Sequence, residues 1–147
     1  MGQFLTTEEL AVFIKENYVD PLLEYVKPRK QLYGKIVHYM KPSNRYYEAT
    51  FVYSDNTGYH CGFMEKGHVE DRATQDLFEL VYWVLDDYVW NYASNYAAIH
   101  SDGRKNYRRL LFAKEKEFWK VLDERGYKRK CKEIEETLAR YPYEDSE

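Results

Sequence analysis

The sequence predicts an α+β fold: an N-terminal helix, an antiparallel meander of three to four strands, then three helices with the first packed on the sheet. Apolar residues follow helical spacing at the start and in the second half of the chain. The part between them is rich in β-branched and aromatic residues and is divided by short turns. Since the 147 residues contain no internal repeat and no low-complexity linker, we predict a single domain over residues 1–147.

The first helix is predicted to begin after Thr6. Thr6 and Glu9 have the spacing of a capping box, and Leu5 and Leu10 that of a hydrophobic staple. The segment "DPLLEYVK" then predicts either a short second helix or a kinked continuation, because Asp-Pro suits a helix start. The buried positions of the first helix share one stripe: Leu10, Phe13, Ile14 and Tyr18.

Three segments of the middle part predict strands: "LYGKIVHYM", "RYYEATFVYS" and "YHCGFMEKG". The turns "KPSN" and "SDNTG" separate them, and "EKG" predicts a tight hairpin into a short strand, "HVEDR". In the second strand, alternation places Tyr47, Ala49, Phe51 and Tyr53 on one face. We expect helix to cover one face of the sheet and water to reach part of the other.

The second half predicts three helices. Thr74 is the expected N-cap of a helix running to about Ile99, and Asp102 the expected N-cap of the next. Gly126 is expected to end that second helix, and Pro142 to close the last one. We expect the tail "YEDSE" to be frayed, and the basic run "KRKCK" to be a solvated helix face.

The segment "LVYWVLDDYVWNYA" in the central helix carries aromatic residues on nearly every side. At about 100° per residue, one broad apolar face should cover the sheet. The opposite side carries Glu79, Trp83, Asp86, Asp87 and Trp90. One interpretation is that the last two helices cover this side and that Arg104, Arg108 or Arg109 pair with the acids. The other is a partly exposed partner-binding patch, since Trp beside acids suits a basic protein.

Composition narrows the function. The 22 Lys and Arg against 25 Asp and Glu leave a net charge of −3, which argues against a sequence-independent nucleic-acid binder. Aromatic residues make up 18%, with 16 Tyr, and Tyr favours surfaces that bind proteins. Tyr59 is therefore a candidate partner contact on the sheet. The alternative is a ligand- or nucleic-acid-binding module that uses the aromatic sheet face.

Sequence motifs for chemistry are absent. The chain has no metal-ligand spacing, no nucleophile elbow and no phosphate-binding Gly-rich loop, so we expect no catalytic residue, no metal and no cofactor. Asp86 and Asp87 are adjacent on a helix and diverge, so they do not serve as paired carboxylates. No signal peptide or membrane-length apolar run is visible, which favours a cytoplasmic protein with Cys61 and Cys131 reduced and no membrane partner.

Four segments of the C-terminal three-fifths of the chain follow one another in a characteristic order and spacing: "GYHCGFMEKG", "DRATQDLFELVYWVLDD", "YRRLLFAKEKEFW" and "ARYPYED". In this order and spacing they resemble the bacterial Immunity protein 63 family. The resemblance implies a cytoplasmic, non-enzymatic antidote of a polymorphic toxin system that binds a cognate toxin domain. If that toxin is a nuclease, its groove is basic and an acidic, aromatic patch would fit it. A homodimer through the Trp face is an alternative use of that face.

Overall fold

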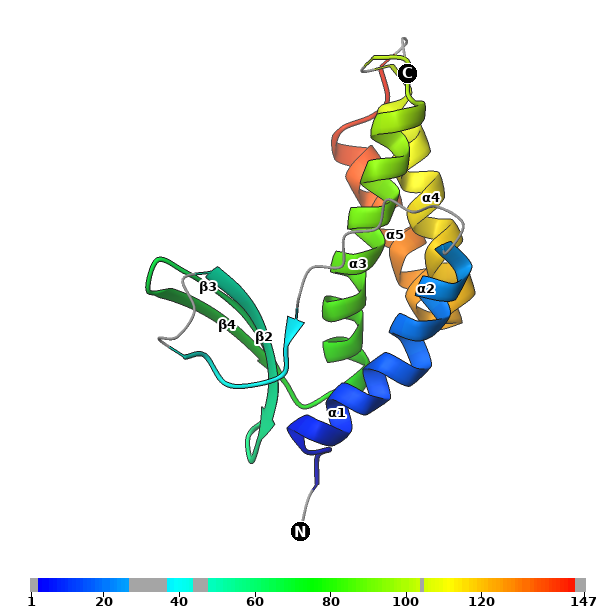
Figure 1. Cartoon of the computed structure of the whole chain (residues 1–147). Coiled ribbons are helices and arrows are strands. Elements are labelled where there is room, and N and C mark those ends of the chain that lie inside the picture. Colours follow the sequence, from blue (N-terminus) through cyan, green and yellow to red (C-terminus); the bar gives the residue numbers. More distant parts are fainter. Residues whose placement is uncertain (1–2, 27–36, 44–47, 104, 145–147) are drawn as a thin grey trace. The chain divides into compact units, whose positions relative to one another are not determined.

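A computed structural model gives the structure of the chain and describes residues 3–26, 37–43, 48–103 and 105–144. It confirms the α+β architecture, with an N-terminal helix, a four-stranded, mostly antiparallel sheet and three further helices (Figure 1). The helical segments are α1 (Thr7–Ile14), the π-helical η1 (Lys15–Val19), α2 (Asp20–Val26), α3 (Leu77–His100), α4 (Tyr107–Leu122) and α5 (Glu124–Arg140). The strands are β1 (Val37–His38), β2 (Glu48–Asp55), β3 (Gly58–Glu65) and β4 (His68–Thr74).

The chain forms two compact units. The sheet unit comprises Met1–Asp20 and Gly34–Leu85, and the helical unit comprises Pro21–Tyr33 and Asp86–Glu147. Helix α3 therefore contributes its first part to the sheet unit and the rest to the helical unit. The expectation of a single domain over residues 1–147 stays a prediction.

The N-terminal helix begins as predicted. The Thr6 hydroxyl accepts a hydrogen bond from the Glu9 N–H at 3.1 Å, and the Thr6 N–H donates to the Glu9 carboxylate at 2.8 Å. The segment from residue 20 onward is a continuation of this helix, because the five π-helical residues of η1 join α1 to α2 without a break. The Asp20 carboxylate accepts from the Lys15 ammonium group at 2.9 Å.

The sheet has the order β1-β2-β3-β4. Strands β2, β3 and β4 form the predicted antiparallel meander, and the turn between β3 and β4 has positive φ at both Lys66 and Gly67. Strand β1 differs from the expected meander because it pairs with β2 in parallel, Val37 opposite Thr50. A parallel pair requires a crossover connection, whereas antiparallel strands can be joined by a tight hairpin, so the expected meander did not provide for this pairing. Residues 32–36 and 44–47, including Tyr46 and Tyr47, lie outside the described residues.

Strand β2 has buried side chains on both of its faces. Phe51 packs with Ala49 and Met64 on one face, and Val52 on the opposite face is also fully buried. The N-terminal segment covers this second face, where the Ser54 N–H donates to the Thr7 hydroxyl at 3.0 Å. On this second face Glu48 is exposed and Thr50 and Ser54 are half-buried, so part of it is accessible to water, as expected.

Three predicted helix ends are wrong, each for a local reason. The carboxylate of Asp76, not Thr74, accepts from the first turn of α3 at the Phe78 N–H. The N-cap position of α4 is Asn106, which adopts φ 54°, rather than Asp102. Asp123 ends α4 and caps α5, so Gly126 lies inside α5 instead of ending the helix before it. The predicted end of α3 near Ile99 is confirmed.

Two further findings concern the chain as a whole. Both Cys61 and Cys131 are free thiols, as predicted. Among the helices that the structure describes, none combines the length and apolar character needed to span a membrane.

Candidate functional site

The six residues predicted to contact a partner are divided between the two units. Glu79 and Trp83 lie in the part of α3 that belongs to the sheet unit, and Tyr59 lies in β3 of that unit. Asp86, Asp87 and Trp90 lie in the helical unit.

Asp86 is the centre of a polar cluster that joins α3, α4 and α5. Its carboxylate accepts from the Lys130 ammonium group at 2.9 Å and from the Trp119 indole N–H at 3.1 Å. The Asp86 side chain is 30% exposed and Lys130 only 9%. The cation that binds Asp86 is thus a lysine of the "KRKCK" run, which was expected to be a solvated face. Asp86 is therefore an internal ion-pair partner, with its carboxylate engaged by Lys130 and Trp119.

Lys130 faces three carboxylates at once. Its ammonium group lies 3.3 Å from the Glu133 carboxylate and 3.6 Å from that of Glu115, in addition to Asp86. Burial lowers the pKa of Lys130, but the attraction of Asp86 and Glu115 outweighs burial and leaves it raised. For Glu115 the balance is the reverse, because burial raises its pKa to about 7 despite the attraction of Lys130. One ammonium group cannot neutralise three carboxylates, and burial therefore dominates at Glu115.

Trp119 and Gly126 complete this cluster by packing. Trp119 is fully buried in α4, and a Cβ added to Gly126 would overlap its ring. The glycine is therefore required for the close approach of α5 to α4, which explains its place inside a helix. The stripe Gly126, Lys130, Ile134 at spacing four was a signal in the sequence that Lys130 is internal.

Trp83 and Trp90 have different surroundings. In the sheet unit the Arg72 guanidinium group lies 4.2 Å from the centre of the Trp83 ring, so β4 partly covers this side chain. Trp90 is 49% exposed, one of the most exposed large apolar side chains of the described residues. Asp87, three positions before it, is half-buried. Of the predicted contact residues, Trp90 is the one most accessible to a partner.

Tyr59 belongs to the core rather than to the surface. It is 4% exposed, its hydroxyl accepts from the Leu5 N–H at 3.0 Å, and its ring packs edge-on against Phe4. A side chain held in this way cannot meet a partner without local unfolding. Phe51 and Tyr53 are buried as well, so neither ring is exposed for the stacking of a base.

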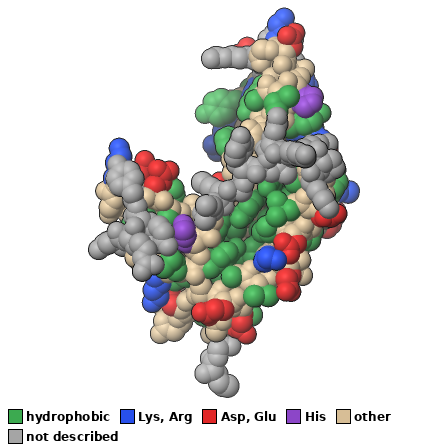
Figure 2. Space-filling view, viewed as in Figure 1, with side chains coloured by type: hydrophobic (Ala, Val, Ile, Leu, Met, Phe, Trp, Pro, Cys, Tyr) green, Lys and Arg blue, Asp and Glu red, His purple; other side chains and the backbone are tan. Residues whose placement is uncertain are grey.

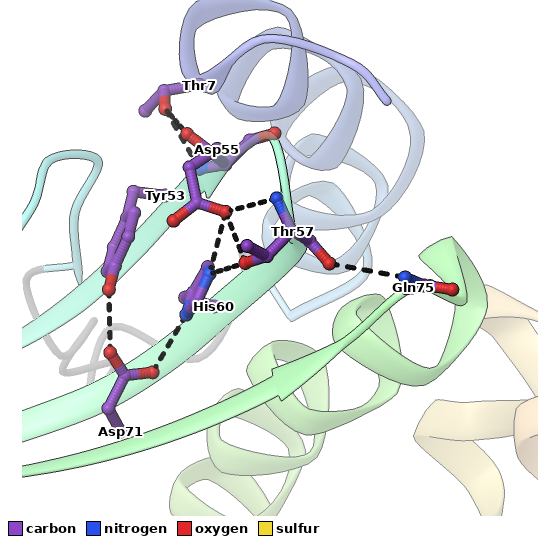
Figure 3. Close-up of polar contacts among 8 residues, drawn as sticks. Thr7, Tyr53, Asp55, Thr57, His60, Asp71 and Gln75 are labelled. Carbon is purple, nitrogen blue, oxygen red and sulfur yellow. Dashed lines mark hydrogen bonds and ion pairs between the residues drawn. The ribbon is translucent and has the colours of Figure 1, made fainter. Parts of the chain in front are cut away.

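A polar network on the sheet was not predicted and links its three antiparallel strands (Figure 3). The ring of His60 stands between two carboxylates, with Nε2 3.0 Å from Asp55 and Nδ1 3.1 Å from Asp71. The Tyr53 ring stacks on His60 at 4.4 Å between ring centres, and its hydroxyl donates to Asp71 at 2.6 Å. Burial and this hydrogen bond raise the pKa of Tyr53 above its usual range. The network holds β2, β3 and β4 in register.

The geometry of this network suits a structural role. The Thr57 hydroxyl lies 3.2 Å from His60 Nε2, so Asp71, His60 and Thr57 superficially have the order of a catalytic triad. However, the Thr57 hydroxyl donates to Asp55 at 2.6 Å, and the Thr57 N–H donates to the same carboxylate. These two bonds hold the pKa of Asp55 well below its usual range. The Thr57 hydroxyl thus donates its proton to Asp55 and not to His60, which suits a turn residue rather than a nucleophile.

In the part of the chain that the structure describes, no group of three or more His, Cys, Asp or Glu side chains could hold a metal ion. The visible face carries separate acidic and basic side chains rather than one continuous basic area (Figure 2).

The predicted Arg-Arg motif and the chain end lie together. Arg108 donates to the carbonyl oxygens of Tyr141 at 2.7 Å and of Pro142 at 2.9 Å. The Arg109 guanidinium group lies 4.1 Å from the centre of the Tyr143 ring. Tyr143 is therefore held against α4 and not frayed, whereas residues 145–147 and Arg104 lie outside the described residues.

Comparison with known proteins identifies the family. The sequence model of Immunity protein 63 matches residues 55–136, which is more than half of the chain. The protein belongs to the Immunity protein 63 family. No curated protein and no solved structure matches the chain.

Proposed function

We propose that this member of the Immunity protein 63 family is an antitoxin-type immunity protein that binds a cognate bacterial toxin domain and neutralises it without catalysis. The single observation that carries the proposal is the family match over residues 55–136. The proposal places the protein in the cytoplasm of a bacterium with a polymorphic toxin system.

The charge of the two units supports a basic partner for the sheet unit. By sequence, the sheet unit has 6 Lys and Arg against 11 Asp and Glu, a net charge of −5. The helical unit has 16 against 14, a net charge of +2. An acidic surface accelerates association with a basic toxin, such as a nuclease with a cationic substrate groove.

In the helical unit, we propose Trp90 and Asp87 as partner contacts. Exposed Trp is a frequent anchor of protein interfaces, and a neighbouring carboxylate suits a basic partner. Trp83 and Glu79 are retained as proposed contacts of the sheet unit, with smaller exposed area. Replacing Trp90 by Ala should weaken toxin binding, whereas Val121→Ala at another exposed apolar position of that unit serves as the control.

The experiment that tests the proposal starts from the reading frame directly upstream of this gene, which we expect to encode the cognate toxin domain. The purified domain is titrated with this protein, and both toxin activity and binding are measured. We expect inhibition to be complete at a stoichiometric ratio and to require a stable complex. Absence of both binding and inhibition would contradict the proposal.

A second arm separates binding from catalysis. The inhibited toxin is recovered under denaturing conditions, refolded alone and assayed again. Full recovery of its activity and unchanged mass are expected for a binding antidote. Inactivation by a small molar fraction of this protein, with a lasting change of toxin mass, would show an enzyme instead.

A further inference from the structure

Strand β4 is an open edge of the sheet. Its only neighbour among the described strands is β3, because the order is β1-β2-β3-β4. The six residues from His68 to Ala73 are all exposed, including Val69 at 41%. An edge of this kind presents a row of unpaired backbone donors and acceptors to solvent.

The turn geometry shows which backbone groups point outward. Lys66 and Gly67 form a two-residue turn with positive φ at both positions, which closes on a hydrogen-bonded pair, here Glu65 and His68. Alternation along the strand then directs the N–H and C=O groups of His68, Glu70 and Arg72 toward β3. The backbone groups of the alternate residues face the open edge: Val69, Asp71 and Ala73.

The edge is also held in place before any partner binds. The Asp71 carboxylate is fixed by Tyr53 at 2.6 Å and by His60 at 3.1 Å, both on neighbouring strands. On the other face, Arg72 stacks on Trp83. A strand anchored on both faces loses little conformational freedom when another strand pairs with it, which favours binding.

We propose that the β4 edge accepts an extended strand of the toxin, which adds to the sheet through main-chain hydrogen bonds. This inference rests on the proposed function and names one of its docking surfaces. Main-chain pairing supplies affinity, and side chains on the added strand supply specificity. The Glu70 side chain, 79% exposed, would face a Lys or Arg of that strand, consistent with the net charge of −5 for the sheet unit.

A second copy of this chain fits the edge less well. Two β4 strands related by a two-fold axis place the central residue directly opposite itself. If the axis passes Glu70, Asp71 or Arg72, two like charges meet across the new pair, which is destabilising. The charges on β4 thus act against self-pairing and favour a partner strand of opposite charge.

The test compares Val69→Pro with Val69→Ala. Proline removes the outward N–H of residue 69 and leaves the pairing with β3 intact, which an edge strand tolerates. We expect Val69→Pro to fold with a nearly unchanged melting temperature and to bind the upstream-encoded toxin domain about tenfold or more weakly. Val69→Ala keeps the N–H and should bind within about twofold of the wild type.

A second pair of variants keeps the proposal testable if the proline variant unfolds. Glu70→Lys should weaken toxin binding and reduce the salt dependence of that binding. The control variant Glu16→Lys makes the same charge change on η1 and should leave toxin binding unchanged. Normal toxin binding by folded Val69→Pro, or by Glu70→Lys, would overturn the β4 docking surface. If the wild type binds no toxin, the proposed function itself fails.

Discussion

Replacing Glu115 by Gln should make the protein more stable at alkaline pH. Glu115 is 5% exposed, and the nearest cation, Lys130, is shared with Asp86 and Glu133. Because burial dominates, the pKa of Glu115 rises from 4.5 to about 7. Gln has the size of the protonated acid and cannot ionise, so it removes only the cost of the charged form.

The sign follows from proton binding in the two states. Between about pH 4.5 and pH 7 the folded protein keeps the Glu115 proton and the unfolded chain does not, so the free energy of unfolding falls as the pH rises. The difference between 4.5 and about 7 corresponds to at most about 3 kcal/mol. The stabilisation that comes from the retained Glu115 proton is fully present below pH 4.5 and is lost above pH 7.

The assay is urea denaturation of the wild type and of Glu115→Gln at pH 4 and pH 8, followed by circular dichroism. The two proteins should differ little at pH 4, and the variant should be more stable by up to about 3 kcal/mol at pH 8. Glu136→Gln, at an exposed position of the same unit, controls for loss of a carboxylate. A variant that is less stable than the wild type at pH 8 would show that attraction by Lys130 outweighs burial, and would refute the reasoning.

Three further substitutions test the packing. Asp86→Lys should cost about 3–5 kcal/mol in denaturant melts, because it opposes a second ammonium group to the buried Lys130; a normal melt would show that Asp86 is not internal. Val84→Ala should cost about 1–3 kcal/mol, since Val84 is 3% exposed, and a loss below about 0.5 kcal/mol would mean that the site is not packed. Gly126→Ala should destabilise by about 1–3 kcal/mol through overlap with Trp119, and an unchanged melting temperature would contradict that contact.

Local signals in the sequence predicted the elements well where two or more neighbouring residues cooperate. The capping box of Thr6 and Glu9 and the Lys66-Gly67 hairpin are confirmed because both depend on interactions within four residues. Single-residue signals were less specific. Gly126 is of the residue type that commonly ends a helix, but here it lies inside α5 and allows close packing against Trp119, which lies on another helix.

The polar clusters could not be derived in the same way. Lys130, Glu115 and Asp86 come from three helices, and nothing within one helix specifies that the three side chains meet. The sequence did contain one signal for this cluster. Glu115 on α4 and Lys130 on α5 are charged residues at buried positions, and a buried charge requires a partner. The network of His60 with Asp55 and Asp71 depends on strand register, which sequence spacing alone did not fix.

The aromatic character of α3 on nearly every side follows from its membership in both units. Its first part, in the sheet unit, buries Leu80, Val81, Tyr82, Val84 and Leu85. The remainder, in the helical unit, buries Val89, Tyr92, Ala93 and Ala97. At about 100° per residue, the centres of these two sets differ by about a quarter turn, so one wheel over the whole helix superimposes two apolar stripes. Asp86 stands where the first set ends and the second begins, and its pairing with Lys130 and Trp119 lets a carboxylate occupy that position among rings. The residue at the centre of the expected acidic, aromatic face of α3 therefore has a structural role, and the partner contacts that we propose on this helix include Trp90, its most exposed aromatic side chain.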